Sequence, residues 1–146
     1  RTPETYLGSS RIQYLANLPS NSCLGSSCEY SLLNEIALNT YQLGGIWKIN
    51  PEEAILDHGE GIIRIGFSAG KVNLVAGSED GVTAEIYLDG QLVNSENSGP
   101  AVVGGEVFFK EDDLYNLIDL KGNYGDHVLD IRFLEPGVSV FAFTFG

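Results

Sequence analysis

Short runs of alternating apolar and polar residues dominate the chain from about residue 36 onward, and they limit the folds open to it. Such runs lie at 63–67, 72–74 and 129–133, and a final apolar run spans 138–145. In the clearest run the apolar residues are Val82, Ala84, Ile86 and Leu88, and the residues between them are Thr83, Glu85 and Tyr87. Period two is the repeat of a β-strand with one buried face, and no stretch of about 12 residues has a convincing helical period. The pattern therefore predicts strands.

The segments between these runs contain residues typical of tight turns. They are Glu79-Asp80-Gly81, Asp89-Gly90 and Glu135-Pro136-Gly137. Consecutive strands joined by tight turns are antiparallel, because a parallel pair needs a long crossover. Three hairpins, and roughly eight to ten strands in one domain, predict closure into two packed sheets. We therefore expect an all-β fold, an antiparallel two-sheet β-sandwich of the jelly-roll type.

The organisation of the chain is that of a single domain. Its 146 residues are 43% hydrophobic and 19% charged, which are ordinary values for a globular domain. Residues 1–35 are predicted to form an irregular segment packed on the sandwich, and residues 36–146 to form the sandwich itself. The chain has no methionine, not even at position 1, so we expect a domain cut from a longer protein.

The charge of the chain argues against two classes of partner. Twenty acidic and eight basic side chains give a net charge of -12, whereas nucleic acids and anionic membrane surfaces require a basic patch. No apolar run approaches about 18 residues, so we expect no direct insertion of this segment into a membrane.

Cys23 and Cys28 are the only cysteines. Their spacing does not match a thioredoxin-type redox pair, and two thiols without a nearby histidine are too few for a structural zinc site. We predict a disulfide across the flexible Gly25-Ser26-Ser27 stretch, and a disulfide implies an oxidising compartment. A pair of free, partly buried thiols is the alternative.

The aromatic residues indicate where a ligand would bind. Tyr87 alternates with core residues, so its ring should face outward, with Glu85 and Asp89 on the same side of the strand. An aromatic plane can stack on the apolar face of a sugar, and carboxylates beside it accept hydrogen bonds from hydroxyls. An irregular N-terminal segment that covers this face is the alternative. Trp47, the only tryptophan, is either a core residue or a second stacking platform in a groove.

Two further features bear on this site and on metals. Lys71 would add a hydrogen-bond donor if the Glu79–Gly81 turn pairs the two strands that it joins. The acidic run Glu111-Asp112-Asp113 fits a solvated turn that protects an edge strand, because it lacks the spaced oxygens of a calcium loop. We expect no cofactor and no metal site, and a structural calcium ion has no motif to support it.

Patterns typical of catalysis are missing. His58 and His127 fall on predicted turns, and no Gly-x-Ser-x-Gly motif lies beside either. The glycine-rich segments are not followed by a helix, as a phosphate-binding loop would be. We therefore expect a non-catalytic domain.

Several short motifs follow one another along nearly the whole chain. They are Thr2-Pro3-Glu4-Thr5-Tyr6-Leu7-Gly8, Gly45-Ile46-Trp47, Phe67-Ser68-Ala69, Tyr87-Leu88-Asp89-Gly90, Leu114-Tyr115-Asn116-Leu117 and Phe143-Thr144-Phe145-Gly146. In this order they resemble the C-terminal domain of DipZ-type proteins, which are bacterial membrane proteins of the thiol–disulfide and cytochrome c biogenesis group. The Cys23–Cys28 segment departs from the family pattern.

The resemblance implies a module similar to carbohydrate-binding modules of β-sandwich fold, placed after a membrane-spanning channel and a thioredoxin-like domain. It also implies an extracytoplasmic location, in the periplasm or on the outer face of the cell membrane, within a larger membrane-anchored protein. The expected function is a non-catalytic carbohydrate-binding-like module that brings a thiol–disulfide oxidoreductase to glycan or cell-wall substrates. The alternative is a structural or docking module that packs on the thioredoxin domain, or on another protein, without binding sugar.

Overall fold

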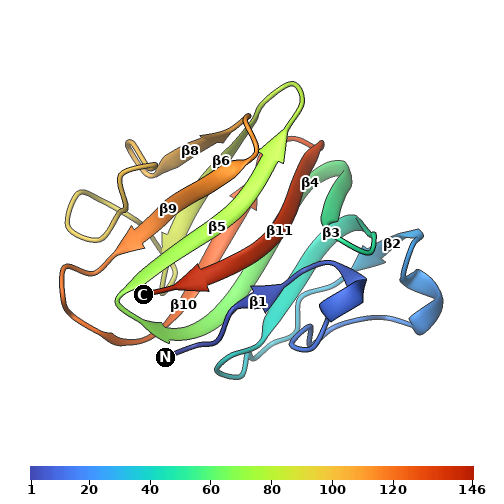
Figure 1. Ribbon diagram of the computed structural model, residues 1–146, viewed down its shortest axis with the longest axis horizontal. Coiled ribbons are helices and arrows are strands. Elements are labelled where there is room, and N and C mark those ends of the chain that lie inside the picture. Colours follow the sequence, from blue (N-terminus) through green and yellow to red (C-terminus); the bar gives the residue numbers. More distant parts are fainter.

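The computed structural model describes residues 1–146 and confirms the all-β fold, with antiparallel strands in two packed layers (Figure 1). Two short 3-10 helices, η1 (Ser9–Arg11) and η2 (Asn21–Cys23), are the only helical segments. No helix has the length and apolar character needed to cross a membrane. The strands are β1 (Thr5–Tyr6), β2 (Ser27–Tyr30), β3 (Tyr41–Ile49), β4 (Ala54–Ala69), β5 (Lys71–Ser78), β6 (Val82–Leu88), β7 (Gln91–Leu92), β8 (Glu106–Phe109), β9 (Asp113–Asp119), β10 (Gly125–Phe133) and β11 (Val138–Phe145).

The two layers are parts of one continuous hydrogen-bonded sheet. The first layer has the order β2-β3-β4-β10-β6, and both β7 and β8 pair with the outer edge of β6. The second layer, in front in Figure 1, has the order β1-β11-β5-β9. The layers join where Ala54 and Ile55, at the start of β4, pair with Val140 and Ser139 of β11. The long strand β4 therefore takes part in both layers.

The core lies between the layers and forms one cluster of 34 buried residues. The alternation seen in the sequence separates buried from outward residues on β4, β6 and β10. The inward side chains of β4 and β10 include Ile63, Ile65, Phe67, Leu129, Ile131 and Phe133. Burial of these side chains selects the face that each strand turns inward, because a shift of one residue would expose the whole apolar set.

Two of the three predicted hairpins are wrong. The Asp89–Gly90 turn does join paired strands, because β7 pairs with β6. The Glu79–Gly81 turn instead connects β5, which pairs with β9 and β11, to β6, which pairs with β7, β8 and β10. The Glu135–Gly137 turn likewise connects β10 in the first layer to β11 in the second. A short turn brings two strand ends together, but at the rim of a sandwich the chain can pass to the other layer.

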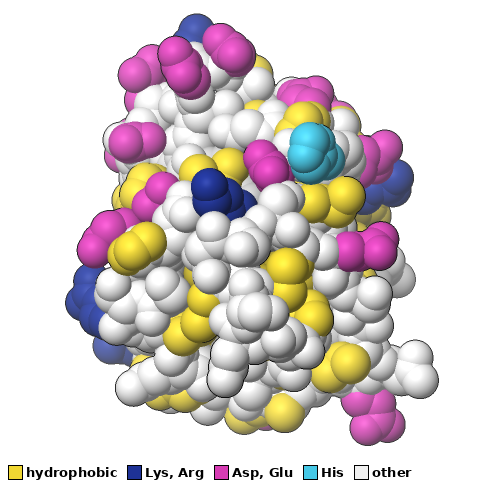
Figure 2. Space-filling view, turned by 90° about the vertical axis from the view of Figure 1, so that its right-hand side faces the viewer, with side chains coloured by type: hydrophobic (Ala, Val, Ile, Leu, Met, Phe, Trp, Pro, Cys, Tyr) yellow, Lys and Arg dark blue, Asp and Glu magenta, His cyan; other side chains and the backbone are white.

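The N-terminal part of the chain packs along one side of the sandwich. β1 pairs with β11, and β2 pairs with β3. The side chain of Gln42, on β3, donates a hydrogen bond to the Glu35 carbonyl and accepts one from the Leu33 amide, so this segment crosses the outer face of β3. No strand or bridge within residues 1–35 pairs with β6. Figure 2 views this side, where uncharged side chains cover most of the surface and acidic side chains gather toward the top.

Candidate functional site

The outward side of β6 carries the side chains that were predicted to bind a ligand. Tyr87 and Glu85 are half-buried, and the residues that alternate with them are buried in the core. The Tyr87 hydroxyl donates a hydrogen bond to Glu85 Oε1 at 3.1 Å. This bond is the largest cause of the raised pKa of the Tyr87 phenol. Both side chains are therefore held in place on the outer face of the first layer.

Charged side chains from neighbouring strands extend this outer face. Arg132 of β10, opposite Glu85, donates from Nη2 (2.9 Å) and Nε (3.2 Å) to Glu60 Oε1. The hydrogen bond to Glu60 is the largest cause of the raised pKa of Arg132. Arg64 of β4 makes a two-point contact with Asp130 of β10, at 2.7 and 2.9 Å. The Arg64–Asp130 pair has the bidentate geometry that planar guanidinium groups favour.

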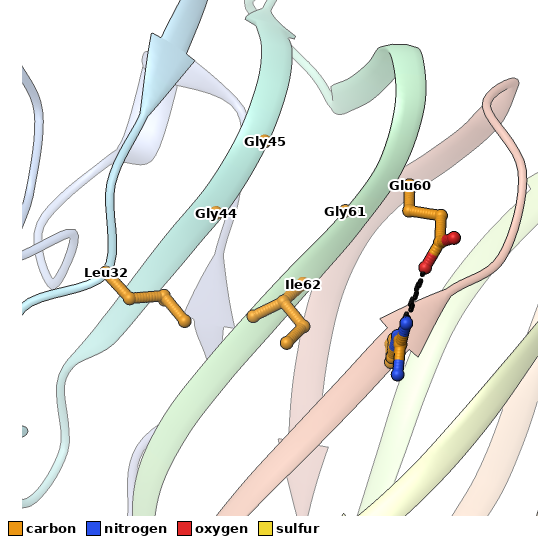
Figure 3. A pocket seen from close by; sticks show the side chains of 7 residues that line it. Leu32, Gly44, Gly45, Glu60, Gly61 and Ile62 are labelled. Atoms are coloured by element: carbon orange, nitrogen blue, oxygen red, sulfur yellow. Dashed lines mark hydrogen bonds and ion pairs between the residues drawn. The ribbon is translucent and has the colours of Figure 1, made fainter.

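A shallow hollow of about 250 Å³ lies on the same face, beside Arg132 (Figure 3). Its floor is the backbone of β3 and β4 at Gly44, Gly45 and Gly61. The side chains of Leu32 and Ile62 form its apolar walls, and Glu60 and Arg132 lie at its rim. The lack of side chains on the floor keeps the hollow open, since a Cβ on Gly44 would lie 3.1 Å from Leu32 Cγ. The hollow thus offers an apolar surface with a charged edge.

Trp47 does not belong to this site, which corrects the prediction of a second stacking platform. Its side chain is 0% exposed and packs edge-on against Phe133, with ring centroids 5.8 Å apart. The indole Nε1–H donates to the Gly44 carbonyl at 2.9 Å. Trp47 is therefore the core residue of the two alternatives, and its ring is closed to a ligand.

Lys71 also lies away from Tyr87. It begins β5, where it pairs with Asp119 of β9 in the second layer. The prediction placed it beside Tyr87 because it assumed that β5 and β6 pair, and they do not. Lys71 therefore does not belong to the candidate site.

Asp89 lies just beyond the end of β6, in the turn that leads to β7, with φ of 51°. Its carboxylate accepts hydrogen bonds from the Val128 amide at 2.8 Å and from His127 Nδ1 at 2.6 Å. Asp89 thus marks the end of the outer face, and it holds the imidazole of His127 in one orientation.

Cys23 and Cys28 form a disulfide, which closes the loop between η2 and β2. Cys28 lies opposite Trp47 in the β2–β3 pair. The acidic residues Glu111 and Asp112 line an open depression together with Glu79 and Lys110, and no hydrophobic residue lines it. No group of three or more histidine, cysteine or acidic side chains is arranged to hold a metal ion.

Sequence analysis missed Arg132, Glu60, Ile62 and Leu32. The alternation around Arg132 already indicated that it points outward, between the core residues Ile131 and Phe133. Its neighbours across the sheet, however, are 72 residues away at Glu60 and 47 away at Glu85. Only the strand order shows that these side chains lie close together.

Comparison with known proteins gives a family and several similar solved structures. A family model described as the thioredoxin-like C-terminal domain matches residues 2–146, and none of the curated proteins matches the chain. A solved family 6 carbohydrate-binding module, studied by dissection of its binding sub-sites, is similar with a TM-score of 0.40 and 14% identity. The similarity covers 85% of this chain and 94% of that one. The family match confirms the resemblance seen in the motifs: the chain belongs to the thioredoxin-like C-terminal domain family.

Proposed function

We propose that this domain is a non-catalytic module that binds a neutral glycan across the outer face of the first layer. The observation that carries the proposal is the combination, on one solvent-facing surface, of an apolar hollow and fixed hydrogen-bonding side chains. The hollow lies between Leu32 and Ile62, and Arg132, Glu85 and Tyr87 follow it across β10 and β6. A sugar ring has apolar C–H faces and a rim of hydroxyls, so it matches both parts.

The charges on this surface favour a neutral glycan over an anionic one. Both arginines of the face are already paired with carboxylates, Arg64 with Asp130 and Arg132 with Glu60. The net charge of -12 adds a repulsive field for a polyanion. A uronic-acid or sulfated polymer would therefore have to displace an existing ion pair in order to bind.

The same pairing argues for a binding module over a glycosidase. Glycosidases use one carboxylic acid that is kept protonated and a second carboxylate across a cleft. Here the carboxylate of Glu60 is occupied by Arg132, at 2.9 Å. The domain would then serve as an accessory, and bring a thioredoxin-family oxidoreductase of the same protein to glycan or cell-wall substrates outside the cytoplasm.

The test is a glycan-array screen of the domain, followed by calorimetric titration of the best neutral ligand. Tyr87→Ala and Arg132→Ala should each weaken binding at least about tenfold, with little change in melting temperature. The matched control is Tyr6→Ala, because Tyr6 is also half-buried and also donates to a carboxylate two residues earlier, Glu4, but lies on β1. Normal binding by folded Tyr87→Ala protein would place the glycan elsewhere.

Docking on another protein is the second candidate function, and one observation favours it. Leu92, Val103 and Phe108 are exposed apolar side chains on and beside β7 and β8, at the outer edge of the first layer. Grouped apolar side chains at a surface are typical of protein contacts. If docking is the function, Phe108→Asp should abolish binding to the thioredoxin-like domain of the same protein, and no glycan should bind in the array.

A further inference from the structure

A second hollow, of about 490 Å³, lies at the end of the sandwich where three loops meet. The turn after β6 contributes Asp89, the loop after β7 contributes Asn97, and the loop before β10 contributes Asn123; Gln91, the first residue of β7, also lines the hollow. The side chains of Leu88 and Leu120, both less than 9% exposed, supply apolar surface. We call this hollow the loop-end pocket, and it is separate from the hollow beside Arg132.

His127, at the start of β10, is held in a fixed orientation in the wall of this pocket. Its Nδ1 lies 2.6 Å from Asp89 Oδ2, and its ring packs on Phe67 with centroids 5.8 Å apart. A carboxylate only accepts hydrogen bonds, so Nδ1 carries a proton and donates it to Asp89. No hydrogen bond of the protein uses Nε2. The pocket therefore contains a pre-oriented ring nitrogen that is free to hydrogen-bond a ligand.

The amide groups of the pocket are also available. Asn97 Oδ1 accepts from the Asn94 amide at 3.0 Å, which fixes the side chain and leaves the two Nδ2 protons without a protein acceptor. Gln91 and Asn123 are exposed, and their side-chain amides have no hydrogen bond within the protein. By contrast, the charged groups of the outer face are bonded to one another. The loop-end pocket thus has the larger unused capacity for hydrogen bonds.

The charges of the pocket restrict the ligand. Asp89 and Glu96 both line it, and no lysine or arginine does; the ammonium group of Lys121, the residue after Leu120, donates to the Ser95 carbonyl at 3.3 Å. An anion would meet carboxylates without a free cation. The remaining groups form a mixture of donors and acceptors over an apolar surface, and the volume is within the range of small-molecule sites.

From these observations we infer that the loop-end pocket is a second binding site, which takes one or two rings of a neutral polyhydroxylated ligand such as a sugar. The site does not depend on the outer face, because it shares no residue with the hollow or with Glu85 and Tyr87; only Asp89, which marks the end of that face, lines the pocket. Hydroxyl groups both donate and accept, so they can satisfy His127 Nε2 and the three amides together.

The experiment is a two-dimensional amide NMR titration of the domain with glucose, xylose and N-acetylglucosamine, and with sodium sulfate as an anion. At least one sugar should shift the signals of Gly90 and the side-chain amides of Asn97 and Asn123. Ligand on the outer face would instead shift Gly44 and Gly61, so the two proposals succeed or fail separately. Absence of sugar-dependent shifts at the loop-end pocket would overturn the proposal of a second site. Equal shifts with sulfate would contradict the inference that its ligand is neutral.

The double variant Gln91→Ala/Asn123→Ala supplies the second test. Both side chains are exposed, so the variant should fold normally and bind the sugar at least about tenfold more weakly. The matched control is Gln13→Ala/Asn34→Ala, which removes the same two side-chain types at exposed positions away from the pocket. Unchanged affinity in the first double variant, or an equal loss in the control, would refute the assignment.

Discussion

Replacement of Trp47 by phenylalanine tests whether the only tryptophan is a core residue. The indole is 0% exposed. Phenylalanine has three fewer ring heavy atoms, and at about 0.8 kcal/mol for each buried CH₂-sized group their loss costs about 2 kcal/mol. The variant also loses the hydrogen bond to the Gly44 carbonyl, which adds about 1 kcal/mol. We therefore expect Trp47→Phe to lower the free energy of unfolding by about 3 kcal/mol.

The assay is urea denaturation of both proteins followed by far-ultraviolet circular dichroism, since the variant has no tryptophan fluorescence. For a domain of this length the expected loss corresponds to a fall in melting temperature of about 6–12 °C. Sugar affinity at 25 °C should stay close to that of the unmodified domain, because the indole is 0% exposed and reaches the hollow only through its hydrogen bond to the Gly44 carbonyl. A loss of less than about 1 kcal/mol, together with weakened sugar binding, would refute the core assignment.

Three further predictions concern stability. Tyr30→Phe should raise the free energy of unfolding by about 1 kcal/mol in urea melts, because the buried Tyr30 hydroxyl has no hydrogen-bond partner; destabilisation would reveal a partner. Burial raises the pKa of Tyr30 and Tyr41, so the unfolded chain loses these protons near pH 10 while the folded one keeps them. The contribution of these phenols to the free energy of unfolding should be fully present below pH 10, and it should fall above pH 10 by up to about 1.4 kcal/mol per pH unit for each phenol. Urea midpoints that stay constant from pH 9 to 11 would contradict this. Reduction of Cys23–Cys28, which closes a loop of sequence separation 5, should cost about 2 kcal/mol, and thiol titration of unreduced, denatured protein should find no free sulfhydryl; two reactive thiols per chain would contradict the bond.

Local patterns in the sequence were sufficient to predict the strands but not their partners. Alternation along 82–88 and 129–133 separates buried from exposed residues, because each strand has one side toward the core. Pairing depends on which layer the chain enters after a turn, and three turn residues carry no such information. The prediction that Lys71 lies beside Tyr87 failed for this reason.

In the candidate site, too, the orientation of a side chain on its own strand could be predicted, but its neighbours on other strands could not. Tyr87 and Glu85 are on one strand, so their common orientation followed from period two alone. The hollow between Leu32 and Ile62 needs β3 and β4 side by side, with Gly44, Gly45 and Gly61 at the contact. Trp47 could not be assigned from its neighbours, since apolar residues occur on both faces of its strand, at Ile46 and Ile49.

The position of β11 affects the order in which the domain can assemble during synthesis. This last strand lies between β1 and β5, and it also joins β4 at the seam of the two layers. Until β11 has emerged from the ribosome, β1 has no partner strand, and the edge of β5 that pairs with β11 is free. The nascent chain therefore stays incompletely folded, with the apolar sides of most strands exposed. In this state chaperone binding or aggregation competes with folding. Ribosomes stalled before and after residues 138–145 have been exposed should hold protease-sensitive and protease-resistant chains, respectively.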